Sequence, residues 1–135
     1  MNIIPKQTPI LFTQIKEPQL PKLDLLHLVL DGKKIDVNDV LIDTGFDSDV
    51  ALPVTYAIKT GIEQVEFHNV EYANGFINTL GFTKGKVKIE EFEFDVEIVW
   101  LDDSNEALIG SGFLAKYAKY LNIDYLNLNL KIELI

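Results

Sequence analysis

The sequence has no cysteine and few basic residues, with 12 Lys and Arg against 21 Asp and Glu. The absence of cysteine excludes disulfides, thiolate nucleophiles and zinc sites built on thiolates. The net charge of −9 has the opposite sign to the basic patches with which proteins bind nucleic acids. It is equally unlike the Lys-rich faces that bind acidic membranes. We therefore expect no nucleic-acid partner and no membrane partner.

Long apolar runs are also missing. No stretch reaches the roughly 20 residues that span a bilayer, and residues 1–7 lack the basic segment and apolar run of a signal peptide. Together with the lack of cysteine, this leads us to expect a cytoplasmic protein. The 135 residues, of which 47% are hydrophobic, are enough for one domain with one core.

Proline is concentrated near the N-terminus. Four of the 5 prolines lie in the first 22 residues, at positions 5, 9, 18 and 21. Because proline at this density disfavours a helix, we predict an N-terminal proline-rich arm over residues 1–22, with a short strand near residues 10–12. Residues 23–135 are predicted to form the folded domain.

The rest of the chain reads as short strands joined by tight turns. Residues 23–30 are apolar, Asp31-Gly32 is a hairpin signal, and residues 35–42 read as the returning strand. From Phe92 to Trp100 every second residue is a large apolar one, and Glu93, Asp95, Glu97 and Val99 lie between them, as in a half-buried strand. These features predict a small, mostly antiparallel β-barrel or sandwich.

Two short helices are expected among these strands. Residues 53–61 have a proline at the start and a glycine at the end, which is the usual asymmetry of helix termini. Ser111 is suited to cap a helix that runs to about residue 121. The residues from 122 onward alternate again and predict a final strand region.

The candidate for chemistry is Asp43-Thr44-Gly45. These residues follow the strand-like run 39–42, so an apolar strand would deliver a carboxylate into a glycine turn. A carboxylate that is held rigidly and partly out of water can have a shifted pKa and take part in acid–base chemistry. Asp and Gly are also common in ordinary β-turns, so the flanking sequence has to decide between the two interpretations.

The flanks resemble a known family. Residues 107–110, Ala-Leu-Ile-Gly, form an apolar segment that opens the helix with Phe113 and Leu114, and a hairpin lies between this segment and Asp43. This order resembles the clan of single-domain aspartic proteases to which the retropepsins belong. Bacterial and archaeal members often read Ile-Asp-Thr-Gly-Phe and then Leu-Pro, as residues 42–46 and 52–53 do here. Residues 122–125 also resemble the strand that follows the helix in those proteins.

The resemblance covers roughly residue 23 to the C-terminus and implies a small closed antiparallel β-barrel of the retropepsin type with one C-terminal helix. It implies that Asp43 is the catalytic carboxylate of an aspartic endopeptidase, that Thr44 stiffens the catalytic pair and that Gly45 admits the substrate backbone. In such enzymes two carboxylates share one proton and activate a water molecule. Because this chain has one such Asp, a homodimer is implied, with a peptide or protein substrate and with neither a metal nor another cofactor.

The same resemblance assigns roles to three further segments. Residues 72–80 would form a flap over the site, with Gly75 providing mobility. The implied substrate-binding and flap positions are Phe46, Asp47, Tyr72, Ala73, Asn74, Gly75 and Phe76. Leu108, Ile109 and Gly110 would support the catalytic loop from beneath.

The sequence departs from the retropepsin pattern in three places. Phe46 stands where retropepsins have Ala or Ser, and its ring would narrow the cleft. Ser111 stands where they have an Arg that pairs with an Asp near the catalytic loop, which leaves Asp47 and Asp49 without that partner. The flap has one candidate glycine, Gly75, where retropepsins have several.

Two other functions stay open at this point. The same barrel can serve as a non-catalytic dimerisation or peptide-binding module in which Asp43 is kept only for its turn. Residues 110–115 also fit Gly-x-Gly-x-x-Ala after a strand, with Glu133 about twenty residues further on, as in dinucleotide-binding sites. The alternating strands and helices that such a site requires are missing upstream.

Overall fold

The computed structural model describes residues 10–15 and 20–135. Three of the prolines on which the predicted N-terminal arm rests, Pro5, Pro9 and Pro18, lie outside the described residues. Among the described residues, Ile10–Gln14 form strand β1, which includes the short strand predicted at residues 10–12.

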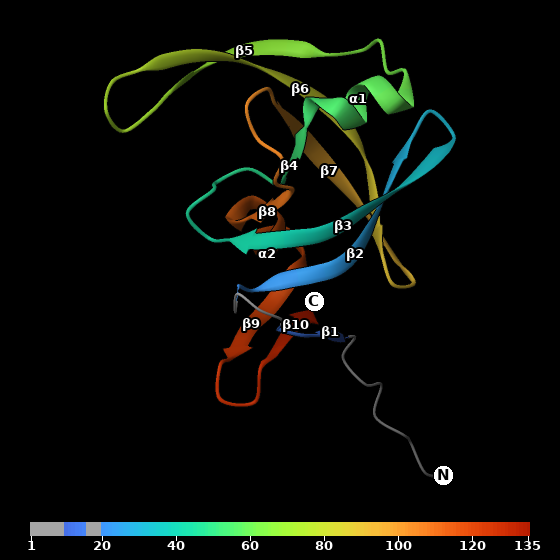
Figure 1. Cartoon of the computed structure of the whole chain (residues 1–135), viewed down its shortest axis with the longest axis vertical. Coiled ribbons are helices and arrows are strands. Elements are labelled where there is room, and N and C mark those ends of the chain that lie inside the picture. The colour runs from blue at the N-terminus through green and yellow to red at the C-terminus, as the bar shows by residue number, and fades with distance from the viewer. Residues whose placement is uncertain (1–9, 16–19) are drawn as a thin grey trace.

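Six strands of the described chain close into a barrel (Figure 1). They are β2 (Lys22–Leu30), β3 (Lys33–Asp43), β4 (Val50–Pro53), β6 (Ile77–Ile89), β7 (Phe92–Leu101) and β8 (Leu108–Gly110). Their order is β2-β3-β8-β4-β7-β6, and β6 also pairs with β2, which completes the ring. The predicted closed β-barrel is therefore confirmed.

Most neighbours in the barrel are antiparallel, as predicted, but β3–β8 and β4–β7 are parallel. Parallel strands cannot be joined by a tight turn and need a longer connection. Here a long excursion separates each pair, so both β8 and β4 enter the barrel next to strands that are distant in sequence. The short β8 is thereby placed between β3 and β4.

The barrel interior is filled by apolar side chains that alternate along the strands. On β7, Phe94, Val96 and Ile98 are buried while Glu93 and Asp95 face solvent, as the alternation predicted. Full burial of one large aliphatic side chain contributes roughly 1.5–3 kcal/mol. The core is therefore the main source of stability for the strands that carry the candidate site.

The two described helices are short. The helix predicted at residues 53–61 is confirmed as α1 (Val54–Thr60), and it ends at Gly61 in the left-handed conformation with φ of 66°. The prediction that the second helix reaches residue 121 is wrong, because α2 spans only Ser111–Tyr117. At Ala118 the backbone becomes extended, with φ of −100° and ψ of 137°. Pairing with a neighbouring strand replaces helical hydrogen bonds from there on.

That pairing forms a second, three-stranded sheet in the order β1-β10-β9 below the barrel (Figure 1). Its remaining strands are β9 (Ala118–Asp124) and β10 (Asn129–Leu134). Leu11, Leu130 and Ile132 from this sheet are fully buried and belong to the same core as the barrel residues. The N-terminal and C-terminal strands therefore pack together on the body of the domain.

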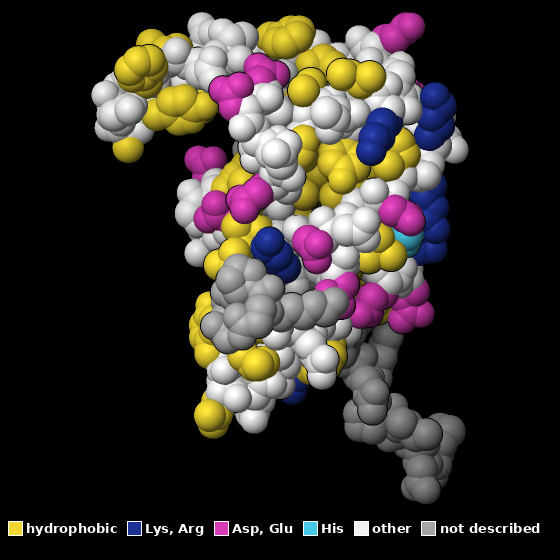
Figure 2. All heavy atoms as spheres, viewed as in Figure 1, with side chains coloured by type: hydrophobic (Ala, Val, Ile, Leu, Met, Phe, Trp, Pro, Cys, Tyr) yellow, Lys and Arg dark blue, Asp and Glu magenta, His cyan; other side chains and the backbone are white. Residues whose placement is uncertain are grey.

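One hairpin projects away from the barrel. It consists of β5 (Glu66–Glu71) and the first part of β6, paired from Glu66↔Phe82 to Glu71↔Ile77. No side chain from residue 66 to residue 79 is buried. Figure 1 shows the hairpin extending over the loop between β3 and β4, and Figure 2 shows a hollow between the hairpin and the body of the molecule.

Candidate active site

Asp43 lies at the end of β3, next to β8. The parallel ladder pairs Ile42 with Ile109 and Asp43 with Gly110, and both isoleucines are buried. The Asp43 side chain is half-buried. Its Oδ1 accepts a hydrogen bond from the Gly45 N–H at 3.0 Å, and the Phe46 N–H donates to the Asp43 carbonyl at 3.1 Å. A buried strand and a tight turn thus fix the position of this carboxylate, as the sequence pattern predicts.

The loop after Asp43 is fastened to the start of α2. The Phe46 carbonyl accepts hydrogen bonds from the Ser111 N–H at 2.7 Å and from the Ser111 Oγ at 3.1 Å. The Gly112 N–H donates to the Ser48 carbonyl at 3.2 Å. Ser111, which stands at the position of the expected Arg, therefore binds the loop through its backbone and hydroxyl group.

Two glycines make this close contact possible. A Cβ at Gly110 would lie 2.2 Å from the Ser48 carbonyl oxygen and 2.5 Å from that of Phe46. A Cβ at Gly112 would lie 2.8 Å from the Asp47 carbonyl oxygen. The Phe46 ring is half-buried, and its Cδ1 would be 3.0 Å from the same Cβ at Gly110. The space above these glycines is therefore occupied by the chain's own loop.

This packing excludes the dinucleotide-binding alternative. A pyrophosphate would need the space that residues 46–49 fill. The helix that follows, α2, has 7 residues. Glu133 lies on β10, which pairs antiparallel with β1 and β9. The Gly-x-Gly-x-x-Ala pattern thus reflects contact between two backbone segments.

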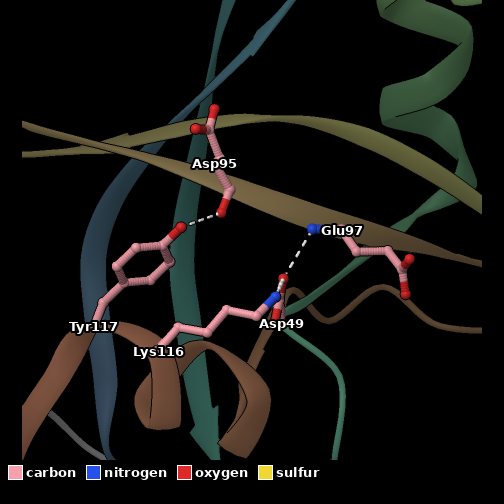
Figure 3. Close-up of polar contacts among 5 residues, drawn as sticks. All are labelled: Asp49, Asp95, Glu97, Lys116 and Tyr117. Carbon is pink, nitrogen blue, oxygen red and sulfur yellow. Dashed lines mark hydrogen bonds and ion pairs between the residues drawn. The ribbon is translucent and has the colours of Figure 1, made fainter.

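Asp49 has a basic partner that the sequence analysis missed (Figure 3). Its side chain is buried, and Oδ2 accepts hydrogen bonds from Lys116 Nζ at 2.7 Å and from the Glu97 N–H at 2.9 Å. Asp49 thus lacks the Arg of the retropepsin pattern but pairs with Lys116, which approaches from α2. The hydrogen bond to Asp49 raises the pKa of Lys116. The only sequence signal for this ion pair was a lysine in the predicted helix that begins at Ser111.

Asp47, the other acidic residue of this loop, is exposed. The two acidic residues of this loop therefore differ in environment, since Asp49 is buried.

The hairpin ends in a tight turn. The Tyr72 N–H donates to the Phe76 carbonyl at 2.7 Å, and the Gly75 N–H donates to the Tyr72 carbonyl at 2.9 Å. The Phe76 N–H also donates to Asn74 Oδ1 at 3.0 Å. Gly75 has φ of 82°, which favours glycine. The segment 72–76, Ala73 included, therefore forms the exposed tip.

The base of the hairpin is anchored in the core. The Trp100 indole N–H donates to Thr83 Oγ1 at 2.8 Å, and this hydroxyl donates to the Gln64 carbonyl at 3.1 Å. Trp100 and Thr83 are both buried. The hairpin is thus fixed where it leaves the barrel and exposed along the rest of its length.

Two cavities of the described chain lie away from the candidate catalytic residues. A cavity of about 670 Å³ is lined by residues of the β2–β3 turn, of the segment 62–66 and of β6, and a second cavity of about 590 Å³ lies beside Lys116 and Tyr117. Neither cavity includes Asp43, Thr44 or Gly45 in its lining.

Two further properties concern only the residues that the structure describes. No group of three or more His, Asp or Glu side chains is arranged to hold a metal ion in residues 10–15 and 20–135. None of the helices in those ranges is long and apolar enough to cross a membrane.

Comparison with solved structures identifies the fold. A retropepsin-like aspartic protease from Rickettsia conorii matches with a TM-score of 0.67 and 19% sequence identity, over 96% of this chain and 96% of that chain. The EIAV protease in complex with an inhibitor matches with a TM-score of 0.55 and 13% identity, over 77% of this chain and 93% of that chain. No model of a protein family matches the sequence, and no curated protein does. The chain therefore has a retropepsin-like fold.

Proposed function

We propose that this protein is an aspartic endopeptidase that acts as a homodimer. Two Asp43 carboxylates, one from each copy, would share a proton and activate a water molecule against a peptide bond. The observation that carries the proposal is the position of Asp43, which a buried strand and its own turn hold at the end of β3. The hairpin extends over the loop that follows β3 (Figure 1). The fold is that of proteins that are themselves described as aspartic proteases.

The dimer follows from the proposed chemistry. One Asp-Thr-Gly in the sequence supplies one carboxylate, whereas the mechanism needs two. A two-fold axis near Asp43 would bring the second carboxylate from another copy. When two carboxylates lie this near to each other, ionising both has a large electrostatic cost. One of them therefore retains a proton over a wide pH range. We therefore expect an acidic to mildly acidic pH optimum.

The hairpin supports a flap role and indicates the class of substrate. Directly opposed residues of an antiparallel pair point to the same face. Phe67 of β5 opposes Gly81 of β6, and Gly81 opposes the buried Trp100 of β7. The face of the hairpin that carries Phe67 is therefore continuous with the interior face of the barrel. Ile77 lies on the same face, and Phe67 and Ile77 are 70% and 64% exposed. We infer that both line the cleft and accept large apolar side chains of an extended peptide.

Replacing Phe67 by Ala should weaken substrate binding more than it slows the chemical step. Loss of an apolar contact of this size corresponds to about 1–2 kcal/mol, so KM for an apolar peptide should rise roughly 5- to 30-fold while kcat changes little. Val70→Ala on the other face of the same strand is the matched control. Steady-state kinetics on one peptide would check this, and equal KM values for both variants would contradict the assigned face.

The proposal as a whole is tested with the purified protein and a peptide library at pH 4 to 7. We expect cleavage that is blocked by a pepstatin-type inhibitor and a specific activity that rises with protein concentration, because the active form is the dimer. Sedimentation under the same conditions gives the mass. A dimer that binds peptides without cleaving any of them would support the alternative of a non-catalytic binding module and would overturn the proposed enzymatic function.

A further inference from the structure

Asp49 joins three elements around the candidate catalytic loop. The parallel ladder between β4 and β7 begins at Val50↔Ile98, one residue after Asp49. The Asp49 carboxylate accepts the Glu97 N–H at 2.9 Å and so extends this ladder by one hydrogen bond. The Asp49 carbonyl accepts the Gly110 N–H at 2.9 Å, beside the position where β8 pairs with Asp43. One residue therefore sets the end of the loop against both β7 and β8.

The Asp49 carboxylate needs a cation because it is withdrawn from water. Its side chain is 4% exposed, whereas that of Lys116 is 55% exposed. A buried carboxylate with a single backbone donor is poorly stabilised, and an ammonium group at hydrogen-bond distance compensates its charge. A lysine is charged throughout the acidic range in which we expect activity, and the hydrogen bond with Asp49 raises the pKa of Lys116 further above its ordinary value.

Lys116 is itself held in place by the helix that carries it. The next residue, Tyr117, donates its hydroxyl hydrogen to the Asp95 carbonyl at 2.6 Å (Figure 3). Its ring also packs against Phe94 and Phe113, with centroid distances of 4.9 and 5.2 Å. The start of α2 is bonded to the loop through Ser111 and Gly112. The ammonium group therefore reaches Asp49 from a rigid base.

We propose that Lys116 is a positioning residue, which acts through Asp49 to hold the loop of residues 43–49 in the geometry that lets two Asp43 side chains meet. This inference rests on the proposed function. For Asp49, Lys116 would take the place of the Arg that the retropepsin pattern has at the position of Ser111, from a later position on the helix.

The test compares Lys116→Met, which keeps the length of the side chain and removes its charge, with Lys116→Arg, which keeps the charge. Misplacement of a catalytic group by about 1 Å can cost on the order of 100-fold in rate. We expect K116M to lower kcat by about 10- to 100-fold with KM nearly unchanged. K116R should recover most of the loss.

The pH profile supplies a readout that a change in stability alone would not move. Two Asp43 carboxylates that are held less closely repel each other less, so the alkaline limb of the K116M profile should move to lower pH. Lys86→Met is the control, because Lys86 lies at 4.0 Å from Asp95 in an exposed pair on the same side of β7. If the folded K116M dimer keeps the wild-type kcat and pH profile, or if K116R is no better than K116M, the proposal is overturned. If K116M does not fold, Lys116→Gln is measured in its place.

If the proposed function itself is wrong, the wild-type protein will show no turnover, and this result is distinct from a loss of activity in K116M alone. In that case the role of Lys116 in holding the loop is decided by amide hydrogen exchange. Faster exchange at Gly110 and Gly112 in K116M than in K86M would support it, since both amides donate to loop carbonyls. Equal protection in the two variants would overturn it.

Discussion

Asparagine in place of Asp43 is expected to reduce peptide hydrolysis by at least about 1,000-fold while the protein stays folded and dimeric. Asparagine has nearly the shape of aspartate and can still accept the Gly45 N–H through its side-chain oxygen. It can neither share a proton with its symmetry mate nor take one from water. General acid–base groups typically contribute 10²–10⁴-fold, and a homodimer loses both carboxylates in one substitution.

Three measurements on the Asp43→Asn protein separate chemistry from folding. Turnover of a cleaved peptide reports the rate, sedimentation reports the dimer, and circular dichroism reports the barrel. Asp95→Asn is the matched control, because Asp95 is an exposed carboxylate on the outward face of β7, and this variant is expected to keep wild-type activity. Wild-type turnover in the Asp43 variant would overturn the proposal that Asp43 is the catalytic carboxylate.

Alanine at Gly110 should cause the largest loss of stability among single substitutions near the site. Its Cβ would lie 2.2 Å and 2.5 Å from two backbone carbonyl oxygens, those of Ser48 and Phe46. Backbone atoms held by hydrogen bonds to Ser111 and Gly112 cannot move aside as the end of a flexible side chain can. We expect a destabilisation of about 3 kcal/mol or more, since overpacking in a rigid environment is among the mechanisms with large effects.

For a protein of this size, that destabilisation corresponds to a fall in Tm of about 10 °C. Gly32→Ala is the control, because φ at Gly32 is +74° but nothing lies within 4 Å of the added Cβ. It should cost only about 1 kcal/mol of backbone strain. Both variants are compared by thermal unfolding at equal protein concentration, since a dimer's Tm depends on concentration. Equal Tm values for G110A and G32A would mean that the loop does not press on β8 as the structure has it.

Much of the site could be predicted because its signals are local. The position of Asp43 depends on residues within a few places of it, namely an apolar strand before it and a Gly45 amide that binds its carboxylate. The hairpin tip at residues 72–76 and the end of α1 at Gly61 are likewise formed by neighbouring residues. The roles of Thr44, Gly45, the flap residues and Leu108 to Gly110 in catalysis remain predictions, and so does the cytoplasmic location.

The errors in the prediction arose where distant segments meet. The extent of α2 was overestimated because residues 118–124 gain more from pairing with β10 than from continuing a helix, and the strand that provides this pairing lies later in the chain. The basic partner of Asp49 was missed because Lys116 is 67 residues away. Spacing alone could not show that α2 aims this lysine at the loop.

The sequence by itself determined the strands, the turns and the carboxylate at the end of β3, because alternation of apolar residues and the preferences of Asp and Gly act over a few residues. The tertiary structure decided which segments touch: β8 between β3 and β4, the loop against Gly110 and Gly112, and Lys116 beside Asp49. These contacts depend on how the closed barrel packs as a whole, and no short stretch of sequence specifies that packing.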